Sequence, residues 1–133
     1  MLGRRAWRRR FVLVPQLHDN HLFSESLAFN LLLGRGWPAT DRDLEDAREL
    51  CGELGLEELL RSMPGGLDTI VGEVGWQLSQ GERARVFLAR ALLQDAELVV
   101  IDESFASLDP DSIRIAMRVV RKRARSLMVI AHP

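Results

Sequence analysis

Residues 78–103 read LSQGERARVFLARALLQDAELVVIDE, and this stretch is the clearest indication of the fold class. Its later part, Leu98 to Ile101, is an apolar run that predicts a buried strand, and Asp102 and Glu103 follow at once. Its earlier part has apolar residues at helical spacing, which predicts a packed helix from Gly81 to Leu93. A helix that leads into a buried strand is typical of an α/β protein with a parallel sheet.

The two ends of the chain extend this pattern. FVLV, from Phe11 to Val14, predicts a short buried strand that Pro15 ends, because proline cannot continue a hydrogen-bonded ladder. SLMVIAH, from Ser126, predicts a final strand, and a helix is expected from Ser112 to about Arg123. The predicted order is strand, helical section, helix, strand, helix, strand.

The middle of the chain predicts helices only. A first helix is expected from Ser24, as its cap, to about Leu33. Thr40 and Asp43 resemble a capping box that opens a second helix, which Gly55 ends before a short third one. We therefore expect a helical subdomain at about residues 20–80, inserted between portions of an α/β core at 1–19 and 81–133.

Composition limits the function. A formal net charge of -1 argues against a general nucleic-acid binder, and no nucleic-acid partner is expected. The single cysteine, Cys51, has no second thiol or histidine near it in a metal-ligand pattern. FVLV is too short for the core of an export signal, and no aliphatic run approaches the roughly 18 residues that cross a bilayer. A role at a membrane would therefore come through a partner or a further segment.

The acids after the Leu98–Ile101 strand are candidates for metal chemistry. In open parallel sheets ligands bind beyond the carboxyl ends of the strands, so Asp102 could hold Mg²⁺ and Glu103 could orient or deprotonate a water. The start of the Gly81–Leu93 helix is a candidate phosphate site, since Ser79 and Gly81 can offer a hydroxyl and free N–H groups. Taken alone, an aliphatic strand ending in Asp-Glu is common, and the helix could simply be capped and amphipathic.

Together, LSQGE, LARALL, LVVIDE, SLDP and VIAH resemble, in order, the motif series of ATP-binding cassette (ABC) ATPases. The resemblance runs from about Trp7 to His132. It implies a P-loop NTPase-type sheet, ATP and Mg²⁺ as cofactors, and ATP hydrolysis as the activity. It also implies a dimer with a second ABC ATPase domain, either a homodimer or a heterodimer.

The resemblance assigns individual roles. In the signature motif of the family, the equivalents of Ser79 and Gly81 contact the γ-phosphate of ATP held by the opposite subunit, and Gln80 and Glu82 belong to the same motif. Asp102 takes the Walker B magnesium position, and Glu103 that of the catalytic base. The remaining assignments are Asp109 to the D-loop and His132 to the switch histidine.

Each of these last two residues has a second interpretation. His132 follows an apolar strand, where an imidazole could hydrogen-bond a γ-phosphate oxygen, although a lone histidine is also common at surfaces and in cores. Asp109 precedes Pro110 and could start a helix, a role that is compatible with the D-loop.

Two further stretches resemble regions that meet a membrane partner. VPQLHDNHLF resembles the Q-loop, in which Gln16 would approach the metal and the attacking water and respond to the transport partner. DTIVGEVGWQLS resembles a stretch of exporter-type cassettes in which Glu73 would lie near the coupling helices of the transmembrane domains. The resemblance thus implies an ABC exporter subunit at the cytoplasmic face of a membrane, held there by transmembrane domains outside these residues.

The sequence also departs from the family. The usual signature is LSGGQ, whereas Gln80 and Glu82 replace a glycine and the glutamine here, and Gln80 adds a side chain where the backbone approaches phosphate. Nothing matches GxxxxGK, the loop that holds the β- and γ-phosphates, and the only lysine is Lys122. We therefore expect a truncated, later portion of a nucleotide-binding domain that binds ATP weakly and hydrolyses it negligibly by itself.

Two alternatives remain open. One is a soluble, non-transport ABC ATPase that acts on DNA or ribosomes. The other is a non-catalytic partner that supplies only a signature surface to an active subunit, which Gln80 favours. The transported substrate cannot be read from these residues, because the transmembrane segments select it.

Overall fold

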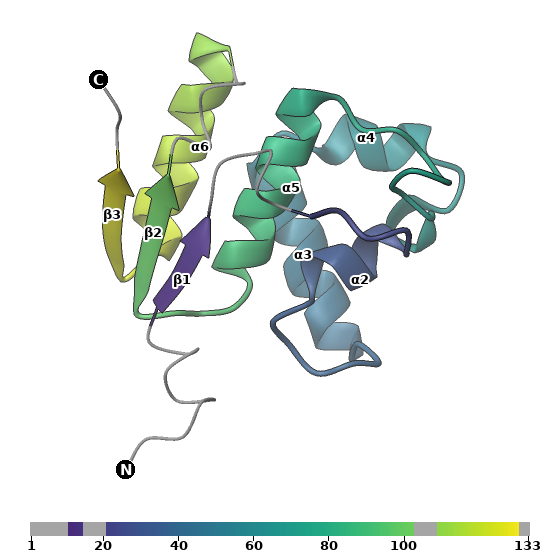
Figure 1. The fold of residues 1–133 in the computed structure, drawn as a ribbon, viewed down its shortest axis with the longest axis horizontal. Helices are drawn as coiled ribbons and strands as arrows, with labels where there is room; N and C mark the ends of the chain where they lie inside the picture. Colours follow the sequence, from purple (N-terminus) through teal and green to yellow (C-terminus); the bar gives the residue numbers. More distant parts are fainter. Residues whose placement is uncertain (1–10, 15–20, 103–108, 131–133) are drawn as a thin grey trace.

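The computed structural model describes residues 11–14, 21–102 and 109–130. In these residues one parallel sheet has the order β1-β2-β3, from β1 (Phe11–Val14), β2 (Leu98–Asp102) and β3 (Ser126–Ile130). Helix α5 (Gln80–Leu92) precedes β2, and α6 (Pro110–Arg123) joins β2 to β3 (Figure 1). The predicted mixed α/β fold with a parallel sheet is confirmed.

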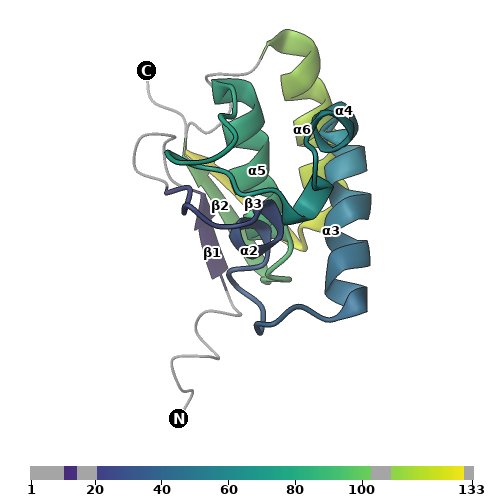
Figure 2. The same cartoon turned by 90° about the vertical axis from the view of Figure 1, so that its right-hand side faces the viewer.

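The helices cover one face of the sheet (Figure 2). Side chains alternate between faces along a strand. One set is buried beneath the helices, namely Val12, Val14, Val99 and Ile101. The alternate set on the outer strands, which includes Phe11, Leu13, Met128 and Ile130, is between 39% and 51% exposed. The sheet therefore has one packed face and one apolar face open to solvent.

Three helices occupy the side of α5 away from the sheet: α2 (Leu27–Leu31), α3 (Asp41–Glu53) and α4 (Glu57–Ser62) (Figure 1). A 3₁₀ turn at Gly66–Asp68 follows them. The capping box predicted at Thr40 is present, since its hydroxyl accepts from the Asp43 N–H and its own N–H donates to the Asp43 carboxylate. Gly55, with φ at +77°, turns the chain after α3 as predicted.

The first helix differs from its prediction. Its cap is Ser26, whose hydroxyl accepts from the Phe29 N–H, and the helix does not begin at Ser24. The reason is a tertiary pairing: Ser26 forms an antiparallel bridge with Ile70, and Glu25 accepts from the Val71 N–H at 2.9 Å. Residues just before Leu27 are thereby held extended, and local helix signals cannot reveal this.

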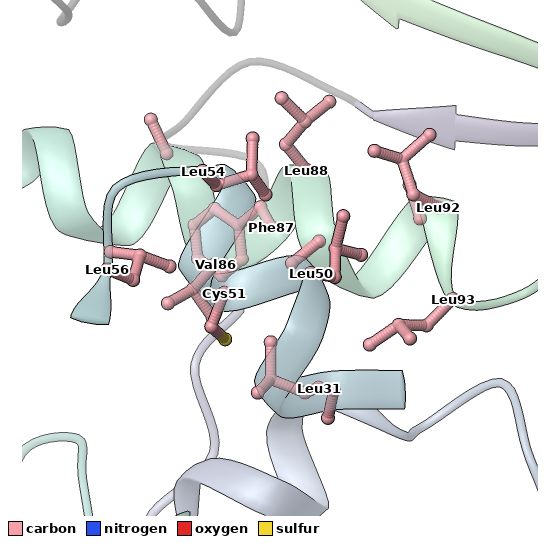
Figure 3. Close-up of a cluster of buried hydrophobic side chains, with 14 of the residues drawn as sticks. Leu31, Leu50, Cys51, Leu54, Leu56, Val86, Phe87, Leu88, Leu92 and Leu93 are labelled. Carbon is pink, nitrogen blue, oxygen red and sulfur yellow. The ribbon is translucent and has the colours of Figure 1, made fainter. Parts of the chain in front are cut away.

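Helix α5 is the centre of the core because it packs between the sheet and the helical part. Leu50 and Cys51 of α3 and its C-cap residue Leu54 lie against Val86 and Phe87 of α5 (Figure 3), and all are at most 2% exposed. Burial raises the pKa of the Cys51 thiol to about 12. Cys51 is therefore a packing residue and not a nucleophile.

Charged side chains connect α3 to the end of α5 and to α6. Arg35 donates to Asp43 and Asp46 of α3, at 3.1 and 2.9 Å, and to the Leu93 carbonyl at the end of α5. Arg123 of α6 pairs with Glu53 of α3 at 2.7 Å, and this hydrogen bond lowers the pKa of Glu53. No helix in the described residues is both long and apolar enough to span a bilayer.

Candidate functional site

The carboxyl ends of the strands meet at one edge of the sheet. Val14 pairs with Ile101, and Asp102 pairs with Ile130, so the parallel strands reach this edge together. Asp102, the last residue of β2, is partly exposed there. The N-terminal ends of α5 and α6 lie at the same end of the molecule as the strand arrowheads (Figure 1). This edge combines a carboxylate with two helix N-termini, where an anion is favoured.

Three predicted site residues, Gln16, Glu103 and His132, lie outside the described residues. Their predicted gathering around Asp102 stays a prediction. Within residues 11–14, 21–102 and 109–130, no three of the His, Cys, Asp and Glu side chains come together to hold a metal. Asp102 by itself suits Mg²⁺, because that ion takes one or two protein carboxylates and fills its other positions with water and substrate phosphate.

The N-terminus of α5 is closed by a capping box. The Ser79 hydroxyl accepts from the Glu82 N–H at 3.1 Å, and the Glu82 carboxylate accepts from the Ser79 N–H at 2.8 Å. This reciprocal arrangement satisfies two of the backbone donors that a helix start leaves open. Ser79 and Gln80 are exposed, and Gly81 and Glu82 are partly exposed. The residues predicted to face a partner are thus on the surface.

Donors remain at this cap for a phosphate group. Because the Ser79 oxygen acts only as an acceptor in the cap, its own O–H can donate outward. The amides of Gln80 and Gly81 have no acceptor within the described part of the chain. A hydroxyl and two amides at a helix start suit an anionic oxygen. The Glu82 carboxylate acts against this, since it places a negative charge beside the same donors.

Asp109 begins α6, as one of its two predicted roles requires. Its carboxylate accepts from the Ser112 N–H at 2.7 Å, and Pro110 follows as the first helical residue. This backbone hydrogen bond lowers the pKa of Asp109, and the nearby charge of Arg85 contributes further. Arg85 also donates to the Gly81 carbonyl at 3.2 Å. Asp109 therefore lies on the same side of the molecule as the start of α5.

The loop that carries Glu73 adjoins a surface pocket of about 250 Å³. The loop is tightly folded, because Gly72 has φ at +101° and a Cβ on Gly75 would overlap the Ile70 carbonyl. Gln77 closes it by donating to the Gly72 carbonyl at 2.9 Å. The pocket is lined by His21, Leu22, Gly72, Glu73, Trp76, Gln77, Leu78 and Arg83.

Arg83 gives this pocket an unused cationic donor. Its Nε is buried and has no acceptor within the described residues, while its guanidinium lies 5.8 Å from the ring centre of Phe87. Sequence reasoning did not single out Arg83, since an arginine after a signature-like motif also fits an ordinary helix surface. A buried and unsatisfied donor in a pocket is a polar group that an acceptor from a partner can satisfy.

Sequence reasoning also missed Asn30 and Arg90. Asn30 is the one fully buried polar residue in the described part of the chain. Arg90 lies in the apolar LARALL run, and its guanidinium carbon is 5.2 Å from the ring centre of Phe87. The available signal was the presence of a strongly polar residue among helical apolar neighbours, because such a residue must find partners inside the fold.

Comparisons with known proteins show which family the chain resembles. Residues 2–106 match the family model described as ABC transporter. The ATP-dependent lipid A-core flippase of Vibrio vulnificus (strain YJ016) is 40% identical over 128 residues, which are 94% of this chain and 21% of the flippase. The flippase of Idiomarina loihiensis is 41% identical over the same length, with the same two coverages.

A solved structure gives the same result. It is described as a bacterial Atm1-family ABC exporter with ATP bound, and it matches with a TM-score of 0.80 at 28% identity. The match covers 96% of this chain and 22% of that one. The predicted α/β fold of the P-loop NTPase type is thereby confirmed. The chain spans about a fifth of the length of the proteins that it matches.

Proposed function

Because the chain belongs to the ABC transporter family, we propose that it is part of an ATP-binding domain of an exporter, in which ATP binding and hydrolysis drive transport across a membrane. The observation that carries the proposal is the start of α5, where the Ser79 hydroxyl and the amides of Gln80 and Gly81 are available to a phosphate. The names of the relatives, which are flippases and an exporter, support the same direction of transport.

In this proposal the chain contributes to two half-sites. Ser79 and Gly81 donate to the γ-phosphate of ATP held by a second ABC ATPase domain, with Gln80 and Glu82 beside them. Asp102 would hold Mg²⁺ at the sheet edge, and Gln16 is the proposed second group for that metal. Glu103 orients or deprotonates the attacking water, His132 stabilises charge on the γ-phosphate, and Asp109 lies between the two half-sites. Hydrolysis of the bound ATP supplies the free energy.

The pocket beside Glu73 is the proposed contact with transmembrane domains, together with the Gln16 loop. Glu73 is exposed, and the buried Nε of Arg83 lacks an acceptor in the described residues. A polar helix end from a partner would satisfy that donor. The proposal puts the chain at the cytoplasmic face of a membrane, with residues of about 20–80 as the helical subdomain.

A non-catalytic partner subunit is the second candidate, and Glu82 favours it. The acid lies 2.8 Å from the Ser79 N–H and weakens the positive end of the α5 dipole that a triphosphate requires. The polypeptide of these 133 residues also contains no GxxxxGK loop. We therefore expect it to hydrolyse ATP negligibly by itself in either case.

An association experiment tests the proposal. The 133-residue chain is mixed with an intact exporter ATPase domain that carries GxxxxGK and a Glu-to-Gln change of its catalytic base, so that ATP persists. We expect a one-to-one complex in analytical ultracentrifugation with ATP and Mg²⁺, and dissociation with ADP. A mixture that stays monomeric with saturating ATP contradicts the proposed function.

Glu82→Gln is expected to strengthen this ATP-dependent association by about threefold to tenfold. Glutamine preserves the capping box, and it removes a negative charge beside the triphosphate. This range corresponds to about 0.7 to 1.4 kcal/mol, a size that suits one partly exposed charge in a screened site. Glu57→Gln is the matched control, because Glu57 lies on the exposed surface of α4. Equal affinities of wild type and Glu82→Gln would contradict phosphate binding at this cap.

A further inference from the structure

Arg90 binds a separate part of the chain from within α5. Its Nε donates to the Asn30 carbonyl at 2.7 Å, and its Nη2 donates to the His21 carbonyl at 2.9 Å and to the Asn30 side-chain oxygen at 3.3 Å. The planar fork of a guanidinium can reach several acceptors at fixed angles, which an ammonium group cannot reproduce. Arg90 therefore fixes both the position and the orientation of these carbonyl groups.

Asn30 continues this network to the segment His21–Ser26. Its side-chain oxygen accepts from the Phe23 N–H at 2.8 Å, and its side-chain nitrogen donates to the carbonyls of Phe23 and Ser26, both at 3.0 Å. Asn30 is 0% exposed, so water cannot replace these bonds without opening the core. The backbone of this segment is thus hydrogen-bonded to the Asn30 side chain of α2, and Arg90 connects it to α5.

The start of the same segment lines the pocket beside Glu73. His21 and Leu22 are lining residues, together with Gly72 and Glu73 of the loop. Ser26 forms a bridge with Ile70, just before that loop, so the segment and the loop are also joined directly. At the opposite end of α5 from Arg90 lies the Ser79 cap. Burial lowers the pKa of Arg90 to about 10, which still leaves the guanidinium charged at neutral pH.

We propose that Arg90 is a positioning residue that makes the segment His21–Ser26, whose first two residues line the pocket, move together with α5, and so couples the pocket to the phosphate-facing end at Ser79. The inference rests on the proposed function for the identity of the two sites. The coupling itself rests on the hydrogen bonds of Arg90 and Asn30. A displacement of this segment must either carry α5 with it or break these hydrogen bonds.

Hydrogen exchange of the 133-residue chain tests the inference through Arg90→Lys. Lysine keeps the charge but cannot hold the carbonyls of His21 and Asn30 at once in the same geometry. In the nucleotide-free chain we expect amide exchange at residues 22–26 to rise at least tenfold, with exchange in α3 unchanged. The Phe23 amide is the most direct probe, because it donates to Asn30. If the amides of residues 22–26 exchange at the wild-type rate in Arg90→Lys, the inference is overturned.

Arg85→Lys is the matched control. Arg85 lies on the same helix and donates to the carbonyls of Leu54 and Gly55, at 3.3 and 3.0 Å, so its conservative change is expected to loosen the end of α3 and leave residues 22–26 unchanged. If Arg85→Lys raises exchange at residues 22–26 as much as Arg90→Lys does, the effect is general loosening and the inference is overturned.

A second exchange experiment, with nucleotide present, distinguishes a positioning role of Arg90 from a merely structural one. The chain is combined with the intact, hydrolysis-impaired ATPase domain and ATP–Mg²⁺. In wild type we expect protection both at residues 79–83 and at residues 22–26, whereas Arg90→Lys keeps the first and loses the second. A full response at residues 22–26 in Arg90→Lys overturns the inference. Absence of protection at residues 79–83 in wild type contradicts the proposed function instead, and the nucleotide-free comparison then still tests whether Arg90 holds residues 22–26 to α5.

Discussion

Ser79→Asp is expected to weaken the ATP-dependent association with an intact ATPase domain at least about a hundredfold. The change removes the hydroxyl donor and places a negative charge where the triphosphate would bind. Two unit charges about 5 Å apart repel by about 3 kcal/mol at an effective dielectric constant of about 20, which is enough for a hundredfold loss. The measurement is a titration of the labelled partner domain at fixed ATP and Mg²⁺.

The fold is expected to tolerate this substitution. Aspartate caps a helix about as well as serine does, and an acid near a helix N-terminus is favourable, so the free energy of unfolding should change by less than about 0.5 kcal/mol. Ser79→Thr is the control, because threonine keeps both the cap and a hydroxyl donor, and its affinity should stay within about fivefold of wild type. Comparable binding by Ser79→Asp and wild type would show that the start of α5 does not meet phosphate.

Leu88→Ala is expected to lower the free energy of unfolding by about 2 to 5 kcal/mol. Leu88 lies on α5 and is 1% exposed, in the cluster drawn in Figure 3. Alanine would leave a cavity in the helix that packs against both the sheet and the helical part, and close-packed interiors fill such cavities only in part. Urea denaturation followed by circular dichroism measures the change.

The control for this prediction is the same chemical change at an exposed site. Leu33 is 37% exposed and follows α2, so Leu33→Ala should cost less than about 1 kcal/mol. If the free energy of unfolding falls by similar amounts in the two variants, α5 is not the centre of the core.

The secondary structure that local patterns specify was predicted well. The apolar runs at Phe11–Val14 and Leu98–Ile101 are strands, and the Thr40–Asp43 capping box starts α3. These features depend on neighbours within a few positions. The start of α2 was predicted two residues early because the bridge between Ser26 and Ile70 is a contact between distant parts of the chain.

For the candidate site, the sequence predicted the positions of two residues. Ordered motifs pointed to Ser79 and Asp102, and the structure places them on an exposed helix start and at the sheet edge, while their roles stay predictions. The network of Asn30 and Arg90 was not predictable, because its meaning depends on which carbonyl groups the fold brings to the guanidinium. The assignments of Gln16, Glu103 and His132 rest on the sequence and its family resemblance, since these residues lie outside the described ranges.

A crystal structure of the complex between this chain and the hydrolysis-impaired ATPase domain, grown with ATP and Mg²⁺, would show whether the start of α5 binds a nucleotide. We expect a γ-phosphate oxygen within hydrogen-bonding distance of the Ser79 hydroxyl and the Gly81 N–H, with the triphosphate held by the partner's own loop. A complex in which the triphosphate is sandwiched elsewhere, with Ser79 facing solvent, would contradict it.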